Sequence, residues 1–187
     1  LSAVELSSKS LEVCKQRFGV YDFRANFYLG DAEKLSSFVP VEKYDLIYSF
    51  GVIHHTPHPE KVIEEIKKYC GPSPRRSGYG HAGGPETEVR LMLYSKWSWK
   101  VLWIVLRYGK GMFWKAGELV PKYSEAQIGS PVSYAYSFGD VHKLLNGFKI
   151  IEIRKDHIFP YEIEKYKNYE YQNVWYFKYL PKPLFRW

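Results

Sequence analysis

Cysteine is scarce in this sequence, and long apolar runs are missing. The 187 residues include two cysteines, which rules out the disulfide framework on which small secreted domains depend. Cys14 and Cys70 fall on apolar faces of predicted helices, so we expect free, buried thiols in a reducing compartment, the cytoplasm. The apolar run at residues 101–106 is too short to span a bilayer, and we predict no transmembrane segment.

Several patterns that carry chemistry are missing as well. His54, His55 and His58 share one predicted turn, but no carboxylate or cysteine completes a metal-binding set, so we predict no metal site. No Ser-His-Asp or Cys-His arrangement can be argued. Residues 78–83 match G-x-G-x-x-G, but they follow a helical pattern and precede a strand pattern, the reverse of a phosphate-binding loop.

The composition is that of an ordered globular protein. The sequence is 45% hydrophobic and 25% charged, and its length suits a single domain, residues 1–187, with a proper core. The formal net charge of +7 and the 18% aromatic content permit binding to nucleic acid or anionic lipid, but such a charge also serves solubility.

The most informative stretch runs from Tyr44 to Cys70. Residues 46–50 are an apolar run typical of a strand buried inside a parallel sheet, and Gly51 permits a turn after it. A polar loop follows, and after Pro59 the apolar residues recur at helical spacing. Because ligands of open α/β sheets bind beyond the carboxyl ends of the strands, residues 49–56 are expected at the mouth of a site.

The rest of the chain repeats this alternation. Strand patterns near residues 1–5, 26–29, 45–50, 89–94 and 148–153 alternate with helical patterns. The sequence therefore predicts an α/β fold, with a mostly parallel sheet and helices on both faces.

Residues 44–69, YDLIYSFGVIHHTPHPEKVIEEIKKY, resemble the fourth strand and following helix of the class I S-adenosylmethionine-dependent methyltransferases of the small-molecule type. The resemblance is close over residues 1–70 and loose over residues 89–153. It implies a Rossmann-like fold, S-adenosylmethionine as cofactor, and direct in-line transfer of a methyl group to a small-molecule acceptor.

The resemblance also implies cofactor contacts in the first two loops. Glu5, with Leu6 beside it, matches the acid that binds the ribose hydroxyls. Asp31 matches the residue that accepts a hydrogen bond from the adenine amino group, and the backbone N–H of Ala32 faces a ring nitrogen. From the residues alone, Glu5 is equally a solvated carboxylate at the end of a strand.

The loop after residues 46–50 supplies the remaining candidates. Ser49, Phe50 and Gly51 are expected to line the cofactor pocket. His54 and His55 lie where the acceptor would approach, so one of them is a candidate general base, since imidazole titrates near neutrality. The alternative is a histidine that is packed or hydrogen-bonded beside the cofactor.

In the family, a glycine-rich loop that holds the amino-acid end of the cofactor precedes the strand ending at Glu5. We therefore expect the domain to lack this loop, to be incomplete at both ends, and to bind S-adenosylmethionine poorly as it stands.

The remaining segments divide by composition. Residues 1–70 and 89–153 form the expected core, with residues 71–88 as a loop insertion. Residues 97–131 are a predicted lid or cap, in which residues 97–107 form either a buried helix or a lid that contacts the acceptor or a membrane surface. Residues 111–131 are expected to form an irregular lid or loop. Residues 157–187 are aromatic and basic, which suits helix packing or base stacking.

Two other functions remain open. A nucleic-acid methyltransferase or binder is less favoured, because no Asn-Pro-Pro-Tyr or Asp-Pro-Pro-Tyr motif is present. The other is a non-catalytic fragment that keeps the outline of the fold.

Overall fold

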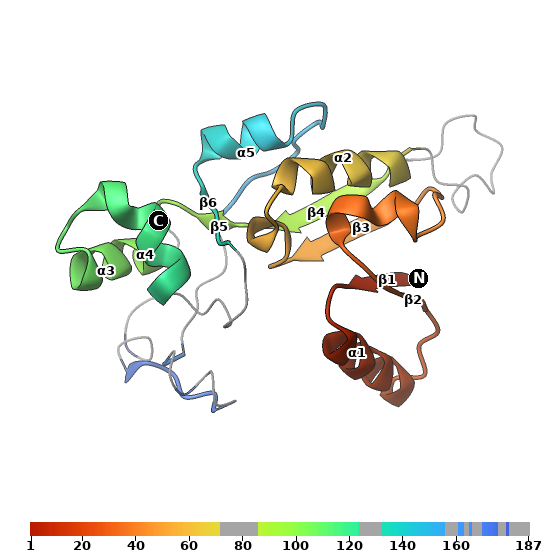
Figure 1. Cartoon of the computed structure of the whole chain (residues 1–187), viewed down its shortest axis with the longest axis horizontal. Helices are drawn as coiled ribbons and strands as arrows, with labels where there is room; N and C mark the ends of the chain where they lie inside the picture. Colours follow the sequence, from red (N-terminus) through yellow and green to blue (C-terminus); the bar gives the residue numbers. More distant parts are fainter. Residues whose placement is uncertain are drawn as a thin grey trace. The chain divides into compact units, whose positions relative to one another are not determined.

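The structure is a computed structural model that describes residues 1–71, 86–123 and 132–155, together with scattered positions from 161 to 179 (Figure 1). The chain divides into two compact units, Leu1–Met92 and Leu93–Trp187, which are described separately below. That the two units form the one domain expected from the sequence stays a prediction.

The first unit begins with a strand–helix–strand segment. β1 (Ser2–Glu5) and β2 (Asn26–Leu29) pair in parallel, with Ser2 opposite Asn26 and Glu5 opposite Leu29. The helix α1 (Ser8–Val20) connects them, and its first turn is capped by the Ser7 hydroxyl, which accepts a hydrogen bond from the Ser10 N–H. A parallel pair needs such a crossover, which is why the helix lies between the two strands in sequence.

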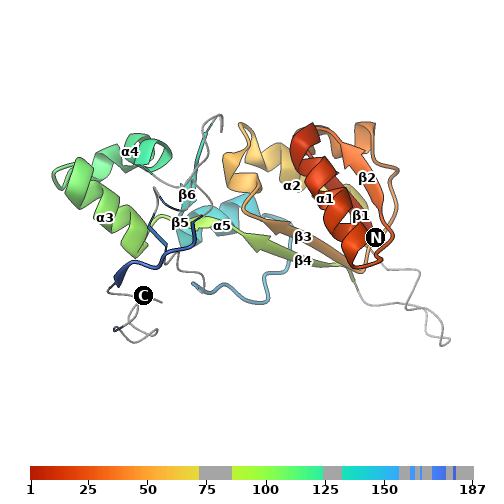
Figure 2. The same cartoon turned by 90° about the horizontal axis from the view of Figure 1, so that it is seen from below.

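The second pair of strands has the same plan. β3 (Leu46–Phe50) and β4 (Glu88–Met92) run in parallel and lie side by side in Figure 2. Between them come the single turn η2 (Ile53–His55) and the helix α2 (Pro59–Tyr69). The inner face of α2 is buried, as its apolar spacing predicts; its buried residues are Val62, Ile63, Ile66 and Tyr69.

The carboxylate of Glu65 fastens α2 to η1 (Ala32–Ser37), the 3-10 segment that follows β2. Its two oxygens accept hydrogen bonds from the Ser36 N–H and the Lys68 ammonium, both at 2.6 Å. Burial alone would raise the pKa of Glu65, whose side chain is only 12% exposed. The bonds from Lys68 and Ser36 outweigh this effect and hold the pKa below its usual value.

A second set of hydrogen bonds joins the two ends of the segment between α2 and β4. The Gly71 N–H donates to the Thr87 hydroxyl at 3.0 Å, and the Thr87 N–H donates to the Gly71 carbonyl at 3.2 Å. The Thr87 hydroxyl also donates to the Tyr44 carbonyl at 2.6 Å. The two ends of the predicted insertion, residues 71–88, are therefore fixed beside the start of β3.

The second unit contains a short parallel pair, β5 (Tyr94–Ser95) and β6 (Ala135–Tyr136), and several helical segments. α3 (Trp99–Tyr108), η4 (Phe113–Lys115) and α4 (Ala116–Tyr123) form a helical hairpin, and α5 (Phe138–Leu144) follows β6. A capping box begins α5, with the side chains of Ser137 and Asp140 each accepting a hydrogen bond from the other residue's backbone N–H.

The hairpin has its own small core. Val101 and Val105 of α3 pack with Val120 of α4, and all three are buried. The rings of Tyr108 and Tyr123 stack with their centroids 3.9 Å apart and their planes parallel within 1°. The two helices approach each other closely at Gly109. A Cβ atom added there would contact the Leu119 side chain and the Val105 carbonyl.

The parallel strands and their crossover helices confirm the α/β class. The described strands form three separate two-stranded sheets, and not the single sheet that the sequence predicts. Among the described helices, none is both long and apolar enough to cross a membrane. Cys14 and Cys70 are free thiols, as expected, although both are half-buried.

Two predictions of local structure are wrong. Residues 148–153 alternate like a strand, but they form none, because no described strand offers them a ladder and Ile151 lies exposed. Residues 111–131 were expected to be irregular, but they include α4. Ala116, Leu119 and Val120 recur at helical spacing and pack on α3, and this packing outweighs the glycine and proline in the segment.

Two sequence features fall outside the described residues. These are the G-x-G-x-x-G match at residues 78–83 and most of the aromatic, basic segment at residues 157–187.

Replacement of Glu65 by glutamine is expected to destabilise the first unit by about 1–2 kcal/mol at neutral pH, because a charged hydrogen-bond acceptor is lost. The contribution of a carboxylate with a lowered pKa is complete above the unfolded-state value of about 4.3 and is lost as the pH falls through the folded-state value. Urea unfolding at pH 7 and at pH 3 should therefore show a difference from wild type that shrinks in acid.

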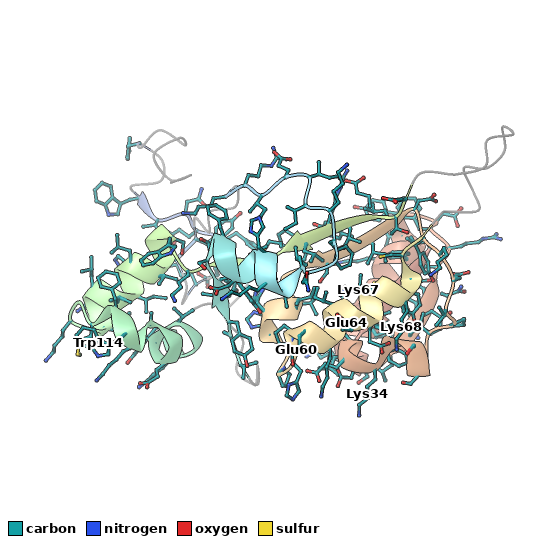
Figure 3. All side chains as sticks on the ribbon, turned by 90° about the horizontal axis from the view of Figure 1, so that it is seen from above. Lys34, Glu60, Glu64, Lys67, Lys68 and Trp114 are labelled. Atoms are coloured by element: carbon teal, nitrogen blue, oxygen red, sulfur yellow. The ribbon has the colours of Figure 1, made fainter. Side chains whose placement is uncertain are left out.

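The matched control is Glu64→Gln on the same helix. The Glu64 side chain is 66% exposed and pairs with Lys67 on the surface of α2 (Figure 3). Such a pair contributes no more than about 0.5 kcal/mol. Equal losses from the two variants would contradict the role given to Glu65.

Replacement of Gly109 by alanine is expected to destabilise the hairpin by about 1–3 kcal/mol, because the new Cβ would lie 2.8 Å from the Val105 carbonyl oxygen. Gly117→Ala is the control, since nothing lies within 4 Å of its added Cβ and alanine favours the helix. Thermal unfolding should lower the midpoint for the first variant and maintain or raise it for the second.

Candidate cofactor site at the carboxyl ends of the strands

The first two loops of the chain meet at one edge of a sheet. Because β1 and β2 are parallel and in register, Glu5 and the segment after Leu29 lie at the same end. The Gly30 N–H donates to the Glu5 carbonyl at 3.0 Å and continues the ladder past the last paired residues. Glu5, Leu6, Asp31 and Ala32 are thereby brought to one edge, as the sequence predicts.

The two acidic side chains are held by bonds within their own turns. Oε1 of Glu5 accepts hydrogen bonds from the N–H groups of Leu6, at 2.9 Å, and Ser7, at 3.3 Å. Oδ1 of Asp31 accepts the Glu33 N–H at 2.9 Å and caps η1. No other described residue bonds to the second oxygen of either carboxylate, so each side chain presents an oriented acceptor.

The third loop begins where β3 ends. Ser49 and Phe50 pair with Leu91 and Met92 of β4, and the chain turns at Gly51. Gly51 has φ of +74°, a conformation that any other residue would adopt only with strain. The requirement for glycine at this position is therefore set by the turn that ends β3.

The two candidate catalytic histidines differ in access. Both lie in η2, with ring centroids 4.2 Å apart. The His54 side chain is fully buried, whereas His55 is half-buried and reaches the surface. Of the pair, His55 is the one that solvent can reach, and His54 is placed to pack behind it.

Glu33 joins the second loop to the third, and sequence analysis missed it. Its Oε1 accepts the His58 N–H at 2.8 Å, across a separation of 25 residues. His58 is the N-cap of α2, so the carboxylate also lies at the positive end of that helix. Glu33 looks like any surface acid of a helical turn in the sequence, and only the tertiary packing of η1 on α2 reveals its partner.

The arrangement is suited to a ligand that donates hydrogen bonds. Two carboxylates and a set of backbone groups gather at the carboxyl ends of parallel strands, where α/β folds bind nucleotides. Ribose hydroxyls and an exocyclic amino group are donors, so the acceptors present fit an adenosyl ligand. The described residues include no group of three or more histidine, cysteine, aspartate or glutamate side chains able to hold a metal ion.

Comparison with known proteins shows which family the first part of the chain resembles. Residues 1–73 match the family described as a methyltransferase domain. Residues 1–73, here called the methyltransferase segment, are thus similar to that family. The match confirms the resemblance seen in the sequence and supports S-adenosylmethionine-dependent methyl transfer in general terms. A search of curated proteins gives no match to the chain.

The methyltransferase segment includes the whole candidate site. It begins before Glu5 and ends after α2, so it contains the three loops and the Glu33 bridge. The second unit lies beyond it. The family match therefore bears on residues 1–73, and the acceptor stays a matter for proposal.

Replacement of Glu33 by alanine is expected to release the His58 N–H at the start of α2. The loss should be about 1 kcal/mol, which corresponds to roughly fivefold faster amide exchange at His58. Hydrogen exchange followed by NMR would measure it.

Glu33→Gln is the matched variant, because the glutamine oxygen can still accept the bond. Amide exchange at His58 in this variant should stay closer to that of wild type. Unchanged exchange in the alanine variant would show that the bridge does not hold the loop.

Proposed function

We propose that this protein transfers a methyl group from S-adenosylmethionine to a small-molecule acceptor. The observation that carries the proposal is the position of Glu5 and Asp31, two oriented carboxylates at the carboxyl ends of adjacent parallel strands within a methyltransferase-family segment. The free thiols of Cys14 and Cys70 support a reducing compartment, and we propose a cytoplasmic location.

The proposed cofactor contacts follow the three loops. Glu5, with Leu6 beside it, binds the ribose hydroxyls, and Asp31 accepts a hydrogen bond from the adenine amino group. The N–H of Ala32 faces the adenine ring. Ser49, Phe50 and Gly51 complete the wall at the end of β3, with Glu33 fixing the distance between the second and third loops.

When bound, S-adenosylmethionine supplies an already activated methyl group on a sulfonium. The protein therefore has to align the acceptor with that group and exclude water, which needs no covalent intermediate. Transfer would replace the carbon–sulfur bond by a bond from the acceptor atom to the methyl carbon and would neutralise the sulfonium charge, with Glu5 and Asp31 holding the adenosyl part.

A base is needed where the acceptor must lose a proton. His55 is the accessible candidate for accepting it, and the buried His54 is a candidate for positioning the His55 ring. His54 and His55 together stay the catalytic candidates.

Replacement of Asp31 by alanine is expected to weaken binding of S-adenosylhomocysteine by roughly 1–3 kcal/mol, because a polar group of the ligand loses its partner. Asp31→Asn separates this effect from the cap of η1: the asparagine oxygen can still accept the Glu33 N–H, while its amide replaces the other acceptor oxygen. Calorimetric titration should show weaker binding for both variants. Only Asp31→Ala should also destabilise the fold, because it loses the cap of η1.

Glu12→Ala, an exposed acid of α1 that lies outside the three loops, is the control and should bind like wild type. The titrations should be run on the 187-residue chain and on a form extended by any native upstream residues. Failure of both forms to bind S-adenosylmethionine and S-adenosylhomocysteine would refute the proposed function.

A further inference from the structure

The helix α3 has apolar side chains on two opposite faces. Val101 and Val105 are buried against Val120 of α4, and Ile104 is buried as well. Trp103 and Leu106 lie on the other face, with the Trp103 side chain 48% exposed and Leu106 more exposed still. The hairpin's core therefore accounts for only half of the apolar character of α3, and the outer face needs another explanation.

The turn after α3 carries further exposed aromatic residues. Trp114 in η4 is 80% exposed and is among the most exposed large apolar side chains of the described chain (Figure 3). Its neighbour Phe113 is about half exposed. An exposed indole at the tip of a helical hairpin is costly in water, because its apolar area stays hydrated.

Basic residues accompany these apolar side chains. Four basic residues and one acid, Glu118, fall between positions 101 and 123. All five lie among the exposed residues of the hairpin; the basic ones are Arg107, Lys110, Lys115 and Lys122. Arg107 follows Leu106 directly, and Lys115 follows Trp114. At two points of the hairpin an exposed basic side chain thus follows an exposed apolar one directly in sequence.

The hairpin is already ordered before any partner binds. The Tyr108–Tyr123 stack and the close helix approach over Gly109 hold α3 against α4. A preformed surface loses little conformational entropy on binding.

We propose that the hairpin binds the surface of an anionic phospholipid bilayer. The surface in contact, here called the hairpin surface, consists of Trp103, Leu106, Arg107, Phe113, Trp114 and Lys115. The apolar side chains enter the interface between headgroups and acyl chains, and the basic ones contact the phosphates. At 1.5 Å per residue, α3 is about 15 Å long, so it lies in the interface and does not span the bilayer.

The positive charge of the hairpin surface would also suit nucleic acid, but its apolar side chains favour lipid. Nucleic-acid surfaces present aromatic rings for base stacking along a basic groove. The hairpin surface includes an aliphatic side chain, Leu106, between aromatic ones, and an aliphatic side chain offers nothing to stack on. The proposal is independent of the cofactor site and of the proposed methyl transfer.

Sedimentation with lipid vesicles tests the proposal on the full chain. We expect binding to vesicles of phosphatidylglycerol and phosphatidylcholine mixed one to two, and much weaker binding to phosphatidylcholine alone. Binding should weaken as salt is raised, since exposed charges are screened. Absence of binding to the anionic vesicles would overturn the proposal.

Two variants separate the apolar and charged contributions. Trp114→Ala should reduce binding to both kinds of vesicle by about tenfold, because one buried indole is lost. Lys115→Gln should reduce binding by about fivefold on the anionic vesicles only. Trp175→Ala, which removes an exposed tryptophan outside the hairpin, is the matched control and should bind like wild type.

Three results would count against the bilayer. Vesicle binding that is unchanged in Trp114→Ala would show that the indole does not enter the lipid. Loss of the same size in Trp175→Ala would show that any exposed tryptophan suffices. A single-stranded oligonucleotide that binds the chain and displaces it from vesicles, with Trp114→Ala weakening both, would assign the hairpin surface to nucleic acid.

Discussion

The carboxylate of Glu65 connects the two segments on which the first unit depends. It accepts hydrogen bonds from η1, which follows β2, and from Lys68 of its own helix, which follows β3. A carboxylate this well buried is stable only because both of its oxygens are bonded. Glu33 adds a second link between the same segments. The loops at the carboxyl ends of β2 and β3 therefore have a fixed spacing, and a ligand that contacts both requires that spacing.

The sequence predicted the four strands of the first unit, where the signal is local. The apolar run at residues 46–50 and the helical stripe from Val62 to Tyr69 depend on side-chain periodicity, and both elements form at the expected positions. The expectation that residues 46–50 are buried on both faces of the strand is wrong, because Leu46, Tyr48 and Phe50 are exposed on one face. Sequence analysis missed α4 and Glu33, because their partners are distant in sequence: α4 is held by the valines of α3, and Glu33 by a backbone group 25 residues away. The predicted strand at residues 148–153 failed for the converse reason, since a strand pattern needs a ladder that no local signal guarantees.

The two units carry the observations behind two separate proposals. The methyltransferase segment lies within the first unit, and its loops offer acceptors for an adenosyl ligand. The second unit has its own core of valines and presents aromatic and basic side chains on its hairpin. A methyl acceptor drawn from a bilayer or its surface would connect the two proposals, but each depends on different residues and can fail without the other.

The hydrogen bonds between Gly71 and Thr87 have a consequence for how this chain tolerates change in length. They bring the two ends of the intervening segment together independently of what lies between them. For a flexible segment between such ends, each doubling of the number of residues costs about 0.6 kcal/mol in the entropy of loop closure. The register of β3 with β4 is set at Asp45 and Glu88, outside the segment. We therefore expect a fluorescent or affinity tag inserted between Gly71 and Thr87 to leave the register of β3 with β4 unchanged.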